Sequence, residues 1–210
     1  GMKENPIRDL LAQGNWGEDQ ALLQGLRQWQ YAPVLWQAYE TLQEEALFHS
    51  QVHGPGHIHR VLLLAALLCW KEGAPEEMVR QVFRAASYHD VGRTFDGYDI
   101  YHGARSALRL AALTGQTGEA LVELQAAVTV IRGHDITGTA KREMASIVAS
   151  FQPRDLPHAM ALTRLLKDAD NLDRVRLGDL DPKFLRHDSA KDLVGFAQRL
   201  FQRDQAAREP

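Results

Sequence analysis

The amino-acid sequence predicts an all-α fold, arranged as a helical bundle in a single domain. Strand signals are nearly absent, because no alternating β-branched runs occur and no Asn-Gly or Asp-Gly turn joins two such runs. Apolar residues recur instead at i, i+3 and i+4, the spacing of a helix with one apolar face. A chain of 210 residues with 45% hydrophobic and 24% charged residues has the length and composition of one globular domain that buries its own core.

Helices are expected from near the start of the chain. Residues 19–29 carry apolar side chains along one stripe, and residues 34–48 do the same after Pro33, which suits a first helical turn. We expect residues 1–48 to form N-terminal helices that either cap the functional site or simply extend the core. Residues 49–210 then form the main part of the domain.

The central part of the chain contains the most apolar segment. Residues 57–70 are apolar nearly all round, so we expect them to form the buried central helix. Pro75 and two following glutamates suit the start of the next helix, which runs to about His89. Residues 92–99 form a long loop. Further helices are expected at residues 102–113, 118–132, 137–151, 157–169 and 189–204, with a shorter piece that begins at Pro182.

Composition and charge exclude several kinds of protein. The net charge of −3 provides no basic surface for extended nucleic acid. The longest apolar run, residues 61–70, is half of the ~20 residues that a membrane span needs, so we expect no membrane segment. Cys69 is the single cysteine and cannot form an internal disulfide, which fits a reducing compartment. We therefore expect a cytoplasmic protein, whose oligomeric state the sequence leaves open.

Several histidines and aspartates occupy helix ends or inward-facing positions. Any one of them is more often a hydrogen-bonded core residue than a ligand, but an unpaired imidazole or carboxylate is costly to bury. Imidazole and carboxylate groups together form a ligand set for borderline or hard divalent metals, and a metal stabilises several such groups at once. The residues concerned, in chain order, are His57, His89, Asp90, His102, His134 and Asp170.

Three segments that contain these residues follow one another in a recognisable order. They are residues 57–61 (HIHRV), 89–93 (HDVGR) and 167–172 (KDADNL). In this order and in apolar helical context, they resemble the HD-domain superfamily of metal-dependent phosphohydrolases. The pattern of that superfamily is a His before x-x-Arg-Val, an apolar helix that ends in His-Asp-x-Gly, and a later Ala-Asp-x-Leu. The resemblance covers residues 57–172 and implies a bundle of the HD-domain type.

The resemblance also implies a metal centre. Carried over position by position, it assigns six metal ligands: His57, His89, Asp90, His102, His134 and Asp170. Superfamily members that have the additional histidines, here His102 and His134, usually hold two metals. The resemblance implies that Asp90 would bridge the two metals. The implied cofactor is a divalent metal (Fe, Mn, Zn, Co, Ni or Mg), whose identity the sequence leaves open. His53 is an alternative to His57, which we prefer because Arg-Val follows at the family spacing and residues 54–56 (GPG) break a helix containing His53.

The expected chemistry is hydrolysis of a phosphate ester by a metal-activated water. The expected catalytic residues are Asp90, Arg93 and Arg174. Asp90 is also a metal ligand, and the two arginines would bind phosphate oxygens. Arg174 follows Asp170 by four residues and would share its face on a continuing helix. Asp168 cannot share that face and is expected to orient a ligand histidine. The expected substrate is small, phosphorylated and nucleotide-like, and both monoesters and diesters remain open.

Two other functions remain open on the sequence alone. One is a di-iron oxygenase on the same fold, although an oxygenase has no evident need for Arg93 or for the arginine-rich segment after residue 173. The other is a sensor that binds a metal or a nucleotide without turnover, which intact ligands disfavour.

Overall fold

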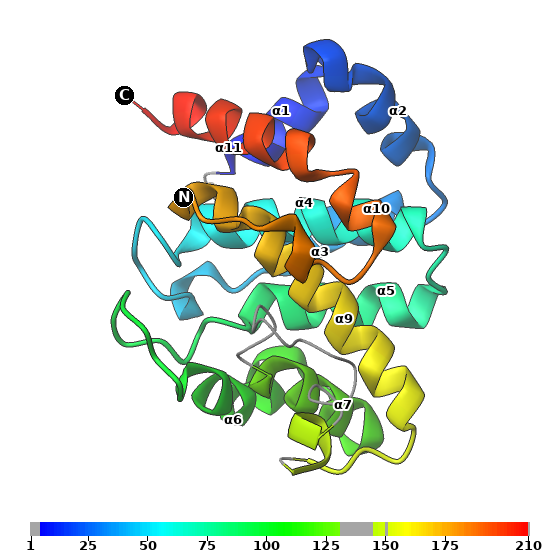
Figure 1. Cartoon of the computed structure of the whole chain (residues 1–210), viewed down its shortest axis with the longest axis vertical. Helices are drawn as coiled ribbons and strands as arrows, with labels where there is room; N and C mark the ends of the chain where they lie inside the picture. Colours follow the sequence, from blue (N-terminus) through cyan, green and yellow to red (C-terminus); the bar gives the residue numbers. More distant parts are fainter. Residues whose placement is uncertain (1–4, 131–144, 150, 210) are drawn as a thin grey trace.

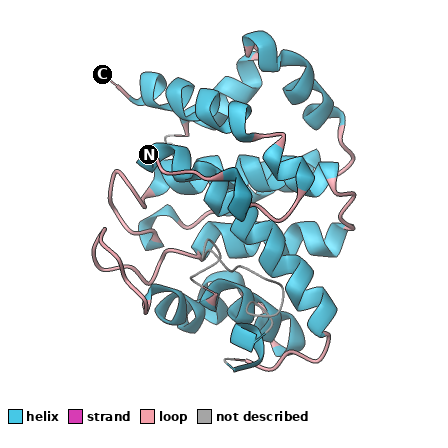
Figure 2. Cartoon of the chain, viewed as in Figure 1, coloured by secondary structure: helices cyan, strands magenta, loops and turns pink. Residues whose placement is uncertain are grey.

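Helices and connecting loops make up the part of the chain that the structure describes. The computed structural model describes residues 5–130, 145–149 and 151–209, and no strand occurs among them (Figure 2). The all-α fold predicted from the sequence is confirmed. The α-helices are α1 (Pro6–Gln13), α2 (Gln20–Gln28), α3 (Ala32–Thr41), α4 (Pro55–Lys71), α5 (Glu76–Tyr88), α6 (His102–Thr114), α7 (Gly118–Thr129), α9 (Leu156–Leu172), α10 (Asp188–Lys191) and α11 (Val194–Arg208). Short 3₁₀ helices are η1 (Gly17–Asp19), η2 (Glu44–Ala46), η3 (Asp173–Leu177) and η4 (Pro182–Phe184).

Two helix boundaries differ from the prediction for local reasons. α3 ends at Thr41 instead of residue 48, because Leu42 leaves the helical conformation and the amide of Gln43 donates to the hydroxyl of Tyr88 (3.1 Å). The predicted final helix is divided at residues 192–193 into α10 and α11. Both breaks fall where the chain changes direction to pack its next segment on the core.

Two further differences concern α1 and the segment before α9. The sequence analysis did not predict α1, which begins after Asn5, whose side chain accepts a hydrogen bond from the backbone of Arg8 and caps the helix. The predicted helix at residues 137–151 lies largely outside the described residues, of which residues 145–149 are helical. α7 ends at Thr129, and the predicted end of that helix at residue 132 also lies outside the described residues.

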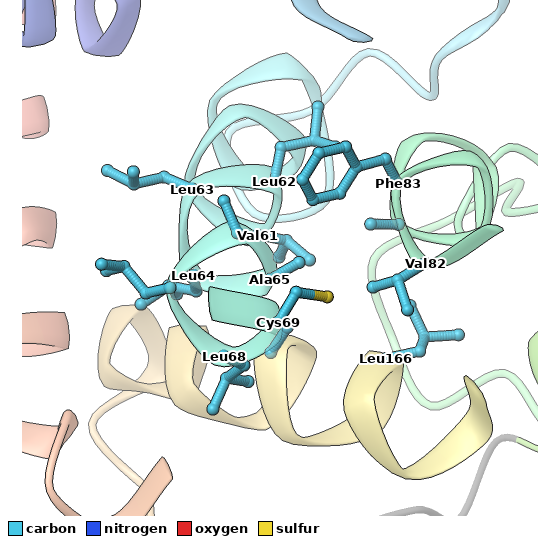
Figure 3. Packing of buried hydrophobic residues seen from close by; sticks show 14 of the residues in the cluster. Val61, Leu62, Leu63, Leu64, Ala65, Leu68, Cys69, Val82, Phe83 and Leu166 are labelled. Carbon is cyan, nitrogen blue, oxygen red and sulfur yellow. The ribbon is translucent and has the colours of Figure 1, made fainter. Parts of the chain in front are cut away.

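α4 forms the centre of the core. Pro55 fits its first turn, where a backbone N–H has no intrahelical partner to lose. Every residue from His57 to Cys69 is buried, as the apolar run predicts. Figure 3 shows apolar side chains of α4 beside Phe83 of α5 and Leu166 of α9. Because each fully buried leucine contributes about 1.5–3 kcal/mol, this packing fixes the position of the first turn of α4 as well as the helix itself.

The other helices surround α4. α5 and α9 pack against it, and α2, α3 and α11 contact it as well. In Figure 1, α1, α2 and α11 lie on one side of α4, α6 and α7 lie on the other, and α9 crosses between them. One apolar cluster extends from Ile7 to Leu200, so the N-terminal helices share the core of the rest of the chain. The division at residue 48 stays a prediction. Within the described ranges, no helix combines the length and the apolar character needed to cross a membrane.

Candidate metal centre

The ends of three helices supply the residues of one buried cluster. His57 lies in the first turn of α4, His89 and Asp90 follow directly after α5, and Asp170 lies in the last turn of α9. α4 packs against both α5 and α9 through its apolar side chains. This packing brings together four residues that the sequence predicted as metal ligands.

The imidazole nitrogens and carboxylate oxygens of these four side chains lie close enough together to bind one metal ion. The Nε2 atom of His57 is 3.3 Å from Oδ2 of Asp90 and 3.2 Å from Oδ1 of Asp170. The Nε2 atom of His89 is 3.4 Å and 3.3 Å from the same two oxygens. Two imidazole nitrogens and two carboxylate oxygens therefore surround a single point. The ligand atoms of His57, His89 and Asp90 all lie within 4.8 Å of one another.

The cluster fits a divalent metal ion. The Nε2 atoms of His57 and His89 are buried, and their contacts with the carboxylate oxygens at 3.2–3.4 Å lack the geometry of hydrogen bonds, so neither atom has a hydrogen-bond partner among the described residues. A buried polar atom without a partner costs about 1–3 kcal/mol, so two of them facing each other at one point indicate a ligand between them. Two imidazoles with two carboxylates are a donor set typical of divalent transition metals.

Hydrogen bonds on the far side of each imidazole orient the histidines. Nδ1 of His57 donates to Oδ2 of Asp173 (2.7 Å), and Nδ1 of His89 donates to the carbonyl oxygen of Ala86 (2.8 Å). Both bonds leave Nε2 as the atom that faces the cluster. Metal-binding histidines usually have such partners, which fix the tautomer and the orientation of the ring.

Opposite charges stabilise the ionised forms of the cluster. Burial raises the pKa of a carboxyl group, but at Asp90 and Asp170 the imidazoles of His89 and His57 outweigh burial and hold both pKa values below the ordinary range of aspartate. Burial and the charge of Arg176 lower the pKa of His57, yet the carboxylates around it raise that pKa to about 9. The site therefore offers two negative charges to a cation at neutral pH.

The loop after Asp90 brings the start of α6 to the cluster. A Cβ atom at Gly92 would collide with the backbone nitrogen of Ser106 and lie 2.7 Å from the carbonyl oxygen of His102. Glycine therefore permits the close contact in which the N–H of Gly92 donates to Oγ of Ser106 (2.8 Å). His102, the first residue of α6, places its Nε2 atom 3.5 Å from Oδ1 of Asp90. Its Nδ1 atom donates to the carbonyl oxygen of Asp99 (2.6 Å).

Arg93 lies at the edge of the carboxylate cluster. Its Nε atom is 3.3 Å from Oδ1 of Asp90, and its Nη1 atom donates to the carbonyl oxygen of Gly97 (3.1 Å). The side chain remains 11% exposed. These contacts hold a positive charge beside the cluster, where a phosphate oxygen could reach it.

Arg174 and Asp168 differ from the expectation. α9 ends before Arg174, and the 3₁₀ helix η3 removes this residue from the α-helical spacing on which its expected position depended. Its guanidinium donates to both oxygens of Asp179 (3.0 and 2.6 Å), and its role in phosphate binding stays a prediction. Asp168 orients none of the ligand histidines that the structure describes, and its predicted role stays a prediction. Asp168 accepts hydrogen bonds from the backbones of Arg186 and His187 and from the His187 ring, so it anchors the segment after η4.

Two other histidines complete the comparison with the sequence. His53 precedes α4, and its Nδ1 atom lies 2.9 Å from Oδ1 of Asp96, so its ring pairs outside the four-residue cluster. The structure thus places His57 rather than His53 between the two carboxylates. His134, the remaining expected ligand, lies outside the described residues.

The sequence analysis missed two residues that hold the cluster in place. Asp173 accepts the Nδ1 hydrogen bond of His57, and Arg60 donates from Nε to Oδ1 of Asp173 (2.8 Å). The available signal was Arg60 itself, a charged residue at the start of the apolar run of α4. A buried guanidinium requires a buried carboxylate partner, and the aspartate one turn after Asp170 is suitably placed.

Comparison with known families agrees with this geometry. The HD domain family matches residues 56–175, which is more than half of the chain of 210 residues. The chain therefore belongs to the HD-domain superfamily of metal-dependent phosphohydrolases, whose members generally bind divalent metals. No curated protein and no solved structure matched the chain significantly. The resemblance inferred from the three motifs is confirmed.

Proposed function

We propose that this protein is a metal-dependent phosphohydrolase or phosphodiesterase that hydrolyses a phosphate ester of a small nucleotide-like substrate. The observation that carries the proposal is the pair of buried Nε2 atoms, of His57 and His89, directed at the same oxygens of Asp90 and Asp170. Membership of the superfamily supports the reaction class.

The residues of the site would divide the chemistry between them. His57, His89, Asp90 and Asp170 would hold a divalent metal, which when bound lowers the pKa of a water and polarises a phosphoryl oxygen. Arg93 would bind a second phosphoryl oxygen, because its guanidinium is fixed beside Asp90 and is partly exposed. Positive charge held in place before the reaction stabilises negative charge that develops on the phosphoryl group.

The two oxygens of Asp90 support the proposal of a second metal. Oδ2 faces His57 and His89, whereas Oδ1 faces His102. A carboxylate with histidines on both sides is suited to bridge two cations. With His102 as a ligand of the second cation, we propose His134 as another, so that six residues hold two divalent metals.

The loop between Asp90 and His102 supports a nucleotide-like substrate. Phe95 and Tyr101 are 50% and 62% exposed although both rings are large and apolar. Within this loop, Arg93 donates to the carbonyl oxygen of Gly97. An aromatic ring stacks on a nucleobase with about 1–3 kcal/mol, so exposed rings in the segment between Arg93 and His102 suit a substrate with a base.

The experiment is hydrolysis of phosphate esters by the protein reconstituted with Mn²⁺, Zn²⁺, Co²⁺ or Fe²⁺. We expect turnover of nucleoside monophosphates or of a nucleotide diester, and weaker turnover of glycerol phosphate, which has no ring to stack. Asp90→Ala should lower kcat/KM by more than about 100-fold, because the carboxylate contacts both ligand histidines and Arg93. Asp188→Ala is the control, since that carboxylate is 100% exposed in α10.

Two results would contradict the proposal. One is the absence of hydrolysis of any phosphate ester with any of the four metals. The other is equal activity in Asp90→Ala and in the wild-type protein. Oxygen uptake by the iron-loaded protein, without phosphate release, would favour an oxygenase on the same fold.

A further inference from the structure

A buried arginine connects the metal centre with the C-terminal helix. Arg60 lies one turn after His57 in α4 and is 1% exposed. Its Nε and Nη2 atoms donate to Oδ1 and Oδ2 of Asp173 (2.8 and 3.1 Å), and its Nη1 atom donates to Oδ2 of Asp204 in α11 (2.6 Å). One guanidinium therefore binds two buried carboxylates from different parts of the chain.

The same series of contacts reaches a metal ligand. Oδ2 of Asp173 accepts the hydrogen bond from Nδ1 of His57, at 2.7 Å. The order of contacts is thus Asp204, Arg60, Asp173, His57, and all four residues are buried. We use the name buried relay for Asp173, Arg60 and Asp204, the three residues of this series other than His57.

α11 contributes more than one contact to the buried relay. The ring of Phe201 lies 5.0 Å from Cζ of Arg60 and packs against the guanidinium. Arg208 donates from Nε to Oδ1 of Asp204 (2.8 Å), so both oxygens of Asp204 are bound. A planar guanidinium bound along one edge to Asp173 and at its other end to Asp204 has little freedom to rotate.

We propose that Arg60 and Asp204 are positioning residues of the metal centre. Through Asp173, they hold the imidazole of His57 in the orientation in which Nε2 binds the metal. α11 lies outside residues 56–175, the part that matches the family, so this chain supports its metal centre with a helix beyond that part. The inference rests on the proposed metal centre, and it adds a specific role for the C-terminal helix. The competing interpretation is that the ion pairs only join α4 to α11.

Metal affinity separates the two interpretations. The metal-free protein is titrated with Zn²⁺ against a competing chromophoric chelator, and the temperature of unfolding of each variant is measured without metal. Removing a group that orients a metal ligand typically lowers metal affinity by 10–100-fold. Asp204 acts through Arg60 and Asp173. We therefore expect Asp204→Asn to lower the Zn²⁺ affinity by about tenfold, the lower end of this range.

Asp19→Asn is the matched control. Asp19 is also buried, and its two oxygens accept hydrogen bonds from Nε and Nη2 of Arg199 in α11 (2.8 and 2.9 Å). This variant likewise breaks an ion pair of α11 with a buried aspartate, although the Arg199 side chain is 35% exposed, and the pair joins α11 to η1 without contacting Asp173. We expect Asp19→Asn to lower the temperature of unfolding while Zn²⁺ affinity stays within about twofold of wild type.

A double variant tests the same proposal if Asp204→Asn does not fold. In Arg60→Met with Asp204→Leu, apolar side chains replace both members of this ion pair, so that neither charge is left buried without the other. Asp173 then keeps Arg176, whose Nη1 atom lies 3.7 Å from Oδ2, as a cationic partner. We expect a folded protein whose Zn²⁺ affinity is again about tenfold lower and whose Co²⁺-substituted spectrum differs from wild type.

The outcomes are distinct. Wild-type affinity in both Asp204→Asn and the double variant would overturn the positioning role while leaving the metal centre intact. Equal loss of affinity in Asp19→Asn would also overturn it, because any weakening of α11 would then suffice. A wild-type protein that binds no metal would instead contradict the proposed function itself.

Discussion

At the scale of single residues, the site depends on how charge is distributed around His57. Its Nε2 atom faces Asp90 and Asp170, and its Nδ1 atom faces Asp173. Burial alone would make this imidazole a weaker base. The carboxylates of Asp170, Asp173 and Asp90 outweigh burial and the charge of Arg176, and they raise the pKa to about 9.

This balance predicts how His57 titrates in the metal-free protein. A pKa of about 9 means that the imidazole is protonated at pH 7, whereas metal binding requires the neutral form. Apparent metal affinity should therefore fall as the pH falls below about 9, and binding at pH 7 should release a proton. The measurement is a ¹⁵N NMR titration of the imidazole in metal-free protein.

The control is Asp173→Asn, which removes one of the three carboxylates and should lower the pKa of His57. A midpoint for His57 at or below 6.5, the ordinary pKa of histidine, would contradict this account of the charges.

At the scale of elements, helix ends rather than helix faces carry the ligands. The first turn of α4, the end of α5 and the last turn of α9 meet at the cluster, and α6 begins beside it. Each of these ends is held by a local contact. At the contact of Gly92 with α6, the chain leaves no space for a side chain.

Gly92→Ala should therefore displace α6. The added methyl group would overlap the backbone of Ser106, which cannot rotate away as a flexible side chain could. We expect a loss of about 1–3 kcal/mol in the free energy of unfolding, the usual cost of overpacking, with a shift of His102 away from Asp90. Urea denaturation measures the first effect.

Gly195→Ala in α11 is the matched control. A Cβ atom there meets only the guanidinium of Arg199, which is the far end of a flexible side chain. Its stability should remain near wild type or rise, because alanine favours a helix over glycine. Equal stability of Gly92→Ala and wild type would show that the contact with α6 is not tight.

At the scale of the whole molecule, much of the fold could be predicted because it follows from local patterns. The apolar run of α4 and the positions of His57, His89 and Asp90 at helix ends are visible within short stretches of sequence. The pairing of Arg60 with Asp204 could not be predicted in this way. It joins α4 to α11 across most of the chain, and no local spacing indicates which buried acid an arginine will meet.

Two expectations near the end of α9 differ from the structure in what surrounds the residue. Arg174 was placed by extending α9 through residue 174, but the chain changes to a 3₁₀ helix there, and Arg174 pairs with Asp179. Asp168 was expected to orient a ligand histidine because it cannot share the face of Asp170, whereas in the structure its carboxylate binds the ring of His187. Tertiary packing, rather than local propensity, determined both outcomes.

The central claim is that His57, His89, Asp90 and Asp170 hold a divalent metal. The measurement that tests it most directly is elemental analysis of the protein purified without added metal and after reconstitution, beside Asp90→Ala. We predict at least one tightly bound metal per chain in the wild-type protein, and two if the second site is occupied. Asp90→Ala should lose this metal. Absence of bound metal in the wild-type protein after reconstitution with several divalent ions would contradict the account.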